Sequence, residues 1–178
     1  MMKKLNKNIA LLLCASMIGL IIIAIIPKNV DEITNAVVNP NNGDIAFSYC
    51  NYSERVDVLR VTVYSKEGER LFSKTFLLEG SYAALKFHED ILCVCEGRIE
   101  NRKHCYDRNG AEVNANITIA EIRERHAFDD WKSSFGKKTY SLDGYTYIYE
   151  APTIFKHIAR LTISDAITEK VIYESTRK

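Results

Sequence analysis

The sequence lacks a marked excess of charge of either sign. Its 178 residues include 24 Lys and Arg against 23 Asp and Glu, interspersed along the chain. Nucleic-acid-binding domains need a strong basic excess, and polybasic lipid-binding segments need a run of like charge. The sequence shows neither pattern, so we expect no nucleic-acid partner.

Motifs of catalysis are missing as well. The chain has no G-x-S-x-G serine elbow, no H-E-x-x-H zinc motif and no glycine-rich phosphate loop. We therefore expect no catalytic residue, no cofactor and no enzymatic activity. An envelope hydrolase with an unrecognised site remains as an alternative.

Charge is absent from the 18 residues between Ile9 and Ile26, which are nearly all apolar. A helix of this length spans about 27 Å, close to the hydrocarbon core of a bilayer at about 30 Å. Pro27 then ends the helix. A cleaved signal peptide is one alternative, but its core is usually shorter and ends at an A-x-A-like site. A buried soluble helix is another, although the run is long for one.

Basic residues before this run indicate the topology. Lys3, Lys4 and Lys7 precede it with no acidic residue among them. The positive-inside rule places such a flank in the cytoplasm. We expect a single-pass plasma-membrane protein with a cytoplasmic N-terminus at 1–8, a transmembrane helix at 9–26, a linker at 27–33 and an extracytoplasmic domain at 34–178.

The rest of the chain shows the pattern of a β-rich domain. Its glycines lie in polar segments suited to turns, and short runs of two-residue alternation lie between them. Such alternation predicts half-buried antiparallel strands. The residues that share a face are Ile45, Phe47 and Tyr49 in one run, Leu59, Val61 and Val63 in the next, and Tyr145, Tyr147 and Tyr149 in a third.

An internal repeat runs through these strands. Turns of the form Tyr-(Ser/Asp)-x-x-Gly begin at Tyr64 and Tyr106, 42 residues apart, and a degenerate copy begins near Ile163. These turns resemble those of β-propeller repeat units in bacterial membrane-anchored extracytoplasmic proteins. The resemblance implies an antiparallel β-meander of about three sheet units. Because a closed ring typically takes about 4–8 blades, we expect an open, propeller-like arrangement.

One amphipathic helix is expected at 119–135. Thr118-Ile119-Ala120-Glu121 has the form of a capping box, in which the first and last side chains bond each other's backbone amides. Aromatic residues follow at helical spacing, with a glycine placed to end the helix: Phe128, Trp131, Phe135 and Gly136. We expect this aromatic stripe to pack on the sheet; a partner-binding or membrane-surface helix is the alternative.

The cysteines outside the apolar run allow three interpretations. They are Cys50, Cys93, Cys95 and Cys105, with His104 nearby. They could be buried free thiols. They could form one disulfide, Cys95–Cys105 or Cys50 with one of the others. They could also contribute a metal site, for which Cys93, Cys95 and His104 are the candidates. The register of the hairpin between them decides which side chains face each other.

Aromatic residues offer a candidate binding face. Tyr145, Tyr147 and Tyr149 line one side of a predicted strand that runs toward Phe155. Such a row could stack on a glycan or hold an extended peptide. It could equally pack against aromatic neighbours across the sheet.

These features favour a membrane-anchored extracytoplasmic domain that binds or scaffolds an envelope protein, a peptide or a glycan. Its membrane contact would be the segment 9–26. The alternative is a metal- or redox-responsive envelope domain that uses Cys93, Cys95, Cys105 and His104.

Overall fold

The computed structural model describes residues 33–51, 58–77, 83–96, 102–124, 128–153 and 158–175. The predicted cytoplasmic segment 1–8, the predicted transmembrane helix 9–26 and Phe155 lie outside these ranges. Within the described ranges, no helix has the length and apolar character needed to cross a membrane.

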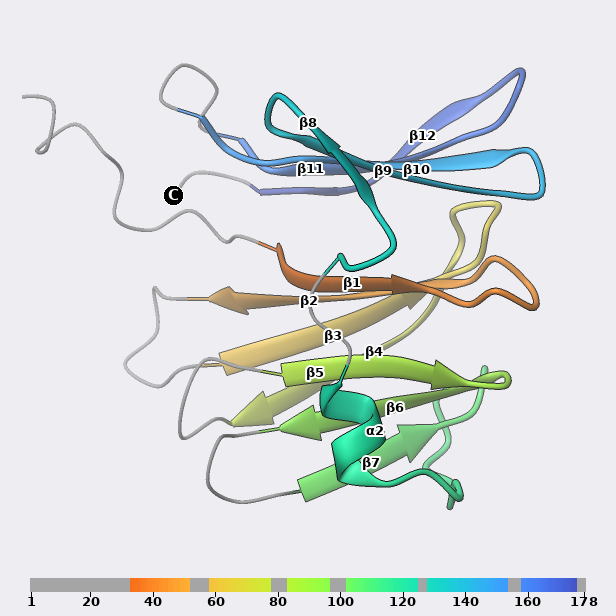
Figure 1. The fold of residues 1–178 in the computed structure, drawn as a ribbon, viewed down its shortest axis with the longest axis vertical. Coiled ribbons are helices and arrows are strands. Elements are labelled where there is room, and N and C mark those ends of the chain that lie inside the picture. The colour runs from red at the N-terminus through yellow and green to blue at the C-terminus, as the bar shows by residue number, and fades with distance from the viewer. Residues whose placement is uncertain are drawn as a thin grey trace, which may run out of the picture.

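Three antiparallel sheets form most of the described chain (Figure 1). Sheet A has the order β1-β2-β3-β4, sheet B the order β5-β6-β7 and sheet C the order β12-β11-β10-β9-β8. The strands are β1 (Ile33–Val38), β2 (Ile45–Asn51), β3 (Val58–Tyr64), β4 (Arg70–Leu77), β5 (Ala83–His88), β6 (Ile91–Glu96), β7 (Arg102–Tyr106), β8 (Lys132–Ser134), β9 (Lys137–Leu142), β10 (Tyr145–Glu150), β11 (Arg160–Ser164) and β12 (Glu169–Glu174). The expected mainly β class, built from antiparallel strands, is confirmed.

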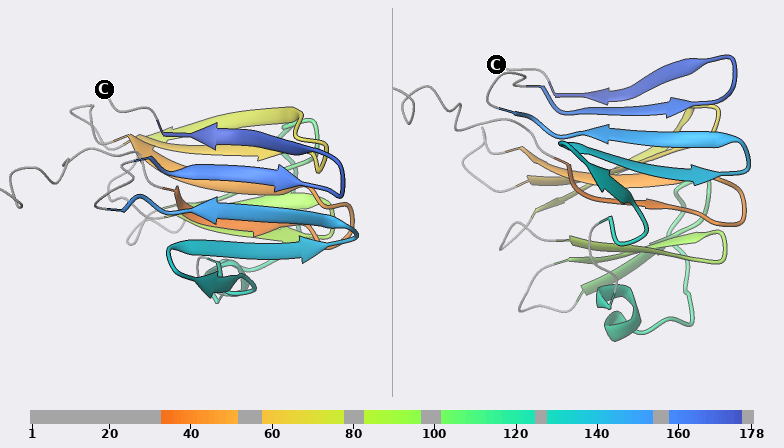
Figure 2. Two further views of the ribbon diagram at one scale, coloured as in Figure 1. Left: turned by 90° about the horizontal axis from the view of Figure 1, so that it is seen from above. Right: turned by 45° about the horizontal axis from the view of Figure 1, so that its top comes forward.

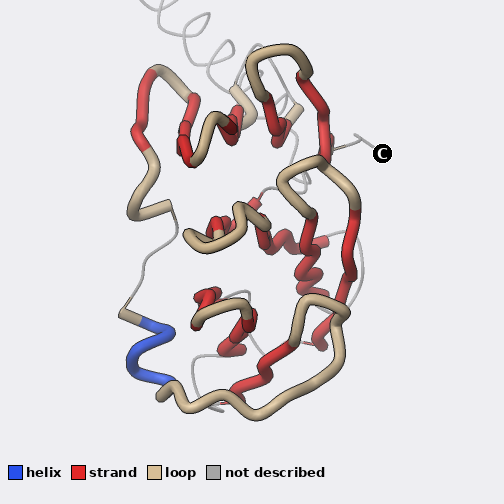
Figure 3. The backbone as a smooth tube through the Cα atoms, turned by 90° about the vertical axis from the view of Figure 1, so that its right-hand side faces the viewer, coloured by secondary structure: helices blue, strands red, loops and turns tan. Residues whose placement is uncertain are grey.

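The sheets stack face to face with sheet A in the middle, as the end-on view in Figure 3 shows. Strand alternation explains why sheet A packs on both sides. Ile45 and Phe47 of β2 face sheet C, whereas Ala46 between them faces sheet B. The alternation predicted for this strand is confirmed.

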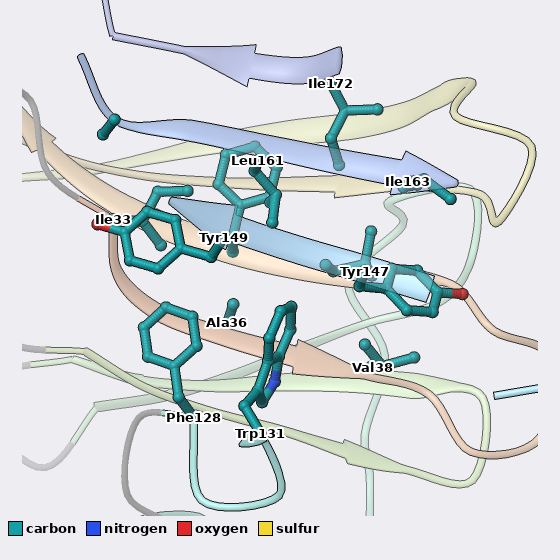
Figure 4. Close-up of a cluster of buried hydrophobic side chains, with 13 residues drawn as sticks. Ile33, Ala36, Val38, Phe128, Trp131, Tyr147, Tyr149, Leu161, Ile163 and Ile172 are labelled. Carbon is teal, nitrogen blue, oxygen red and sulfur yellow. The ribbon is translucent and has the colours of Figure 1, made fainter. Parts of the chain in front are cut away.

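The core between sheets A and C is rich in aromatic rings (Figure 4). Tyr147 of β10 is fully buried, and Phe47 of β2 is only 1% exposed. The core between sheets A and B is mainly aliphatic, with Val61 and Leu85 among its members. Each large side chain removed from water in this way stabilises the fold by about 1.5–3 kcal/mol.

The helix is much shorter than predicted. The capping box at its start is confirmed, because the Glu121 amide bonds the Thr118 hydroxyl and the Glu121 carboxylate bonds the Thr118 amide. Helix α2, however, comprises only Ile119–Arg123 and covers the outer face of sheet B through Ile122. The prediction of a helix over 119–135 is therefore wrong.

The aromatic residues assigned to that helix lie elsewhere. Phe128 has a positive φ of 63°, which an α-helix does not allow, and it packs with Trp131 between sheets A and C (Figure 4). Phe135 and Gly136 form the turn between β8 and β9. The predicted packing of the stripe thus holds for Phe128 and Trp131, whereas Phe135 is exposed.

The two ends of the stack differ in character (Figure 2). Tight turns at one end, which we call the turn end, connect successive strands at residues 39–44, 65–69, 89–90, 143–144 and 165–168. The opposite end, which we call the entry end, is where β1 begins at Ile33. The turn between β8 and β9 also lies at the entry end (Figure 1).

Candidate functional site

Polar side chains join sheets A and B at the turn end. The Arg108 guanidinium, in the turn after β7, donates to both carboxylate oxygens of Asp44 at 2.8 and 3.1 Å. The Asp90 carboxylate, in the turn between β5 and β6, accepts bonds of 3.1 Å from the amides of Asn39 and Asn42. The turns of the two sheets are thus held in a defined relative position.

Asp44 is the most deeply buried acid of this network. Its side chain is 3% exposed, whereas that of Arg108 is 53% exposed. Burial raises the pKa of Asp44 above its ordinary 3.8, although the hydrogen bond from Arg108 acts in the opposite direction. The same bond raises the pKa of Arg108. The bidentate geometry of the pair suits a structural connection between the two turns.

A tyrosine joins sheets A and C. The hydroxyl of Tyr147, in β10, donates to the carbonyl oxygen of Gly43 in the turn between β1 and β2. Burial raises the pKa of this phenol, so it stays protonated and can donate. Gly43 has a φ of 79°, and a Cβ there would lie 3.0 Å from the tyrosine oxygen. Glycine therefore suits both the turn and the close approach of Tyr147.

A pocket of about 370 Å³ opens at the turn end between sheets A and C. The turn between β3 and β4 forms one side, and the turn between β11 and β12 forms the other. Most of its lining residues are polar or charged, with both signs of charge, although their carbon atoms form the larger part of the pocket surface. The lining residues are Lys66, Glu67, Tyr145, Ile163, Asp165, Thr168, Glu169 and Lys170.

Direct contacts hold the two sides of the pocket together. Lys66 Nζ lies 5.5 Å from the ring centroid of Tyr145, a cation–π arrangement. Lys170 Nζ donates to the Glu67 carbonyl oxygen at 3.4 Å. A Cβ on Gly68 would lie 2.6 Å from Lys170 Cδ, so glycine allows the turn of sheet A to approach the Lys170 side chain closely.

Two acids of the pocket, Asp165 and Glu67, have pKa values below their ordinary ones and are ionised near neutral pH. Hydrogen bonds from the backbone amides of Thr168 and Ile167 lower the pKa of Asp165. Partial burial acts to raise the pKa of Glu67, but hydrogen bonds with Ser65 and its own amide lower it overall. The pocket thus presents ammonium groups, carboxylates, two hydroxyls and an aromatic ring, and its described lining has no histidine or cysteine. This set can bind a polar ligand through hydrogen bonds and charge.

The predicted tyrosine row is only partly available to a ligand. Tyr147 and Tyr149 are 0% and 2% exposed and belong to the core between sheets A and C. They cannot form an exposed binding face. Tyr145 is half-buried and lines the pocket. Phe155 lies outside the described residues.

The disulfide joins a different pair from the one predicted. Cys93 of β6 is bonded to Cys105 of β7, and Cys95 is a free, buried thiol. The register pairs Cys95 with Lys103 instead. The Cys95–Cys105 prediction is therefore wrong, because the hairpin is shifted by two residues from the register that this disulfide would need.

The predicted metal candidates do not converge. His104 lies on the opposite face of β7 from Cys105, where its ring packs near Phe76 and its Nδ1 is 3.0 Å from Glu112 Oε1. Cys93 forms the disulfide and so has no thiolate with which to bind a metal. No group of three or more His, Cys, Asp or Glu side chains in the described part of the chain could hold a metal ion.

Sequence reasoning missed most residues of the pocket. Lys66 and Lys170 are 104 positions apart, and only the stacking of sheets A and C brings them together. The internal repeat carried a partial signal, since Lys66 belongs to one of its turns and Lys170 lies in β12, just after the turn of the degenerate copy. The turns that begin at Ser65 and Asp107 indeed share one pattern, in which the glycine amide bonds the carbonyl oxygen of the first residue at 2.9 Å.

Comparison of the chain with protein-family models, curated proteins and solved structures finds no match.

Proposed function

We propose that this chain is a single-pass membrane protein whose extracytoplasmic β domain binds an envelope protein, a peptide or a glycan at the turn end. The pocket between sheets A and C is the observation that carries this proposal. It is preformed and lined by polar groups that come from two different sheets. Its size of about 370 Å³ is adequate for a sugar ring or a few amino-acid side chains.

The membrane part of the proposal is supported by sequence. The segment 9–26 has no charge and follows three lysines. The Cys93–Cys105 disulfide agrees with an oxidising compartment outside the cytoplasm, where such bonds persist. We place the N-terminus in the cytoplasm and residues 34–178 on the other side of the plasma membrane.

The proposal includes a propeller-like relationship between the three sheets. The turns at 65–69 and 107–111 have the same hydrogen-bond pattern at equivalent places in sheets A and B, which supports a common repeat unit. Repeat β architectures commonly bind ligands through loops that are gathered at one end. The turn end has this character, because it gathers the tight turns of all three sheets.

Binding can be tested with the full chain in lipid nanodiscs. Labelled discs are screened against envelope extract, a peptide library and a glycan array, using wild type, Lys66→Glu and Arg60→Glu. Lys66 lines the pocket, whereas Arg60 is exposed on β3 toward the entry end, so the charge change is matched. We expect a ligand that Lys66→Glu loses and Arg60→Glu retains. Absence of any ligand, or equal loss in both variants, would contradict the proposal.

A redox-responsive domain is the second candidate, and the cysteine cluster favours it. Cys93, Cys95 and Cys105 belong to one buried group beneath α2, and it holds both a disulfide and a free thiol. His104 is on the other face of the strand, so this candidate has no metal-binding part. Thiol titration after graded reduction, followed by ligand capture, separates the two functions. If the domain is redox-responsive, the amount of ligand that it captures must change when the disulfide is reduced.

A further inference from the structure

The turn between β8 and β9 holds an apolar side chain fully in solvent. Phe135 has a relative exposure of 105%, followed by Ile167 at 94% and Val171 at 45% among the exposed large apolar residues. Removing such a ring from water is worth about 1.5–3 kcal/mol. Packing within the described fold therefore gives no reason for phenylalanine at this position.

The backbone gives no reason either. Phe135 has a φ of 38° and Gly136 a φ of 75°, so both residues of this two-residue turn are left-handed. Asn, Asp and Gly favour such positions, whereas a bulky side chain there costs about 1–2 kcal/mol. A strained residue that neither packing nor turn chemistry requires points to a role in recognition.

Basic residues flank the exposed ring. The segment 132–138 contains Lys132, Lys137 and Lys138 and no acidic residue. Lys137 is paired with Glu150 of β10 at 2.7 Å, and the Lys138 ammonium lies 3.9 Å from the ring centroid of Phe128. The three lysines of 132–138 less Glu150 leave a charge of +2 at this tip, whereas Asp129 and Asp130 lie before β8 and farther along the chain from Phe135. An exposed aromatic ring with a basic surround is complementary to the headgroup region of an anionic bilayer.

The hairpin lies at the entry end, where the chain arrives from the predicted membrane anchor. The Ala151 amide, just after β10, donates to the Gly136 carbonyl oxygen at 2.9 Å. Tyr149, two residues earlier, belongs to the same buried cluster as Ile33, the first residue of β1 (Figure 4). Six residues, 27–32, separate β1 from the end of the predicted anchor at Ile26, and even a fully extended link of that length spans only about 20 Å.

We propose that Phe135 and its flanking lysines contact the anionic phospholipid surface of the bilayer that anchors the chain. The inference rests on the proposed membrane anchor. The ring would lie among the headgroups and the lysines would approach the lipid phosphates. The domain then stands with its entry end on the membrane, and the turn end with its pocket points away from it.

Ile167 provides an internal control at the turn end. It is nearly as exposed as Phe135 and also lies at the tip of a hairpin. However, Asp165 lies in its turn and Glu169 directly follows the turn, and an anionic surface repels both carboxylates. Exposure alone therefore does not predict which tip meets the lipid, whereas charge and distance from the anchor both select Phe135.

The test uses the full chain in nanodiscs that contain anionic lipid and a gadolinium-chelating lipid. Paramagnetic broadening of backbone amides is compared between residues 134–137 and residues 166–168. We expect broadening at 134–137 and none at 166–168. Neutral discs, or high salt that screens exposed charge, should reduce it. Lys132→Ser should lower the contact about fivefold.

Substitutions at the two tips complete the test. Phe135→Ser should abolish the broadening, Phe135→Leu should retain most of it, and Ile167→Ser should leave it unchanged. Broadening at 166–168 alone, or equal broadening at both tips, would overturn the inference. Insertion into discs without broadening at 134–137 overturns the hairpin contact and leaves the anchor standing. Failure of the chain to insert overturns the anchor and the inference together.

Discussion

The carboxylate of Asp44 accepts two hydrogen bonds from the guanidinium of Arg108, and this ion pair joins the turn of β1 and β2 to the turn after β7. The partners lie in different sheets and are 64 positions apart in the chain. Asp44 is buried and Arg108 is half-exposed. The pair therefore fixes the relative position of sheets A and B at the turn end.

Removing the Arg108 side chain should lower the free energy of unfolding more than neutralising Asp44. Arg108→Ala leaves the buried Asp44 carboxylate without this partner, and we expect the free energy of unfolding to fall by about 2–3 kcal/mol. Asp44→Asn should cost less, because a neutral amide is less costly to bury. Urea unfolding of the full chain in non-ionic detergent measures both. Equal losses would contradict the importance of the buried charge.

The deficit of Arg108→Ala should also depend on pH. Burial holds the pKa of Asp44 above 3.8 in the folded state, and loss of Arg108 raises it further. An acid with a raised folded-state pKa favours the fold at low pH, and that advantage is lost as pH rises through the folded pKa. The difference from wild type should therefore be smaller at pH 4 than at pH 7. An unchanged difference would exclude Asp44 as its cause.

The hydroxyl of Tyr147 should contribute measurably to stability. Tyr147→Phe removes its hydrogen bond to the Gly43 carbonyl oxygen inside the fold, and we expect a loss of about 1–2 kcal/mol. Tyr145→Phe on the same strand face is the control, and its half-buried position predicts a change within about 0.5 kcal/mol. Urea unfolding compares them. A similar small loss in both would show that the Tyr147 bond adds little.

Disulfide mapping tests the register of sheet B. Peptide mapping without reductant should recover Cys93 linked to Cys105 and Cys95 as a free thiol. Cys93→Ala should lower the free energy of unfolding by about 2–4 kcal/mol, and a reductant should then cause no further loss. Cys95→Ala keeps the disulfide and should cost only about 1 kcal/mol. A Cys95–Cys105 peptide would refute this register.

Two glycines with the same backbone conformation separate strain from packing. Gly110 and Gly144 have φ values of 80° and 82°. A Cβ at Gly110 would lie 2.8 Å from Phe72 Cγ, whereas nothing lies within 4 Å at Gly144. Both alanine variants should lose about 1–2 kcal/mol from the left-handed backbone, and Gly110→Ala about 1–3 kcal/mol more. Thermal unfolding ranks them, and equal losses would show that Phe72 moves freely.

Strand alternation and the capping box could be predicted from the sequence because both depend only on neighbouring residues. Ile45 and Phe47 share a face as predicted, and Thr118 caps the helix as predicted. The length of that helix depends on tertiary contacts and could not be predicted from the local sequence. Phe128 and Trp131 have helical spacing, but their burial between sheets A and C stabilises the fold more than a longer helix would. Tertiary packing therefore determines their backbone conformation.

The candidate site shows the same limit. Tyr145 was found because a tyrosine row stands out in the sequence, yet the other two members of the row, Tyr147 and Tyr149, proved to be core. The proximity of Lys66 and Lys170 could not be predicted from the sequence, because it depends on how sheets A and C stack on each other. The observed disulfide register differs by two residues from the one that Cys95–Cys105 would need, and composition and spacing do not determine which register forms.

The central position of sheet A has a consequence for biosynthesis. Its strands precede those of sheets B and C in the chain, so the face toward sheet B stays uncovered until β7 has been made and the face toward sheet C until β12 has been made. During that interval its apolar faces are open to mispairing with other nascent chains. We therefore expect the emerging polypeptide to depend on a holding chaperone, and its yield to suffer most when translation stalls between β4 and β10.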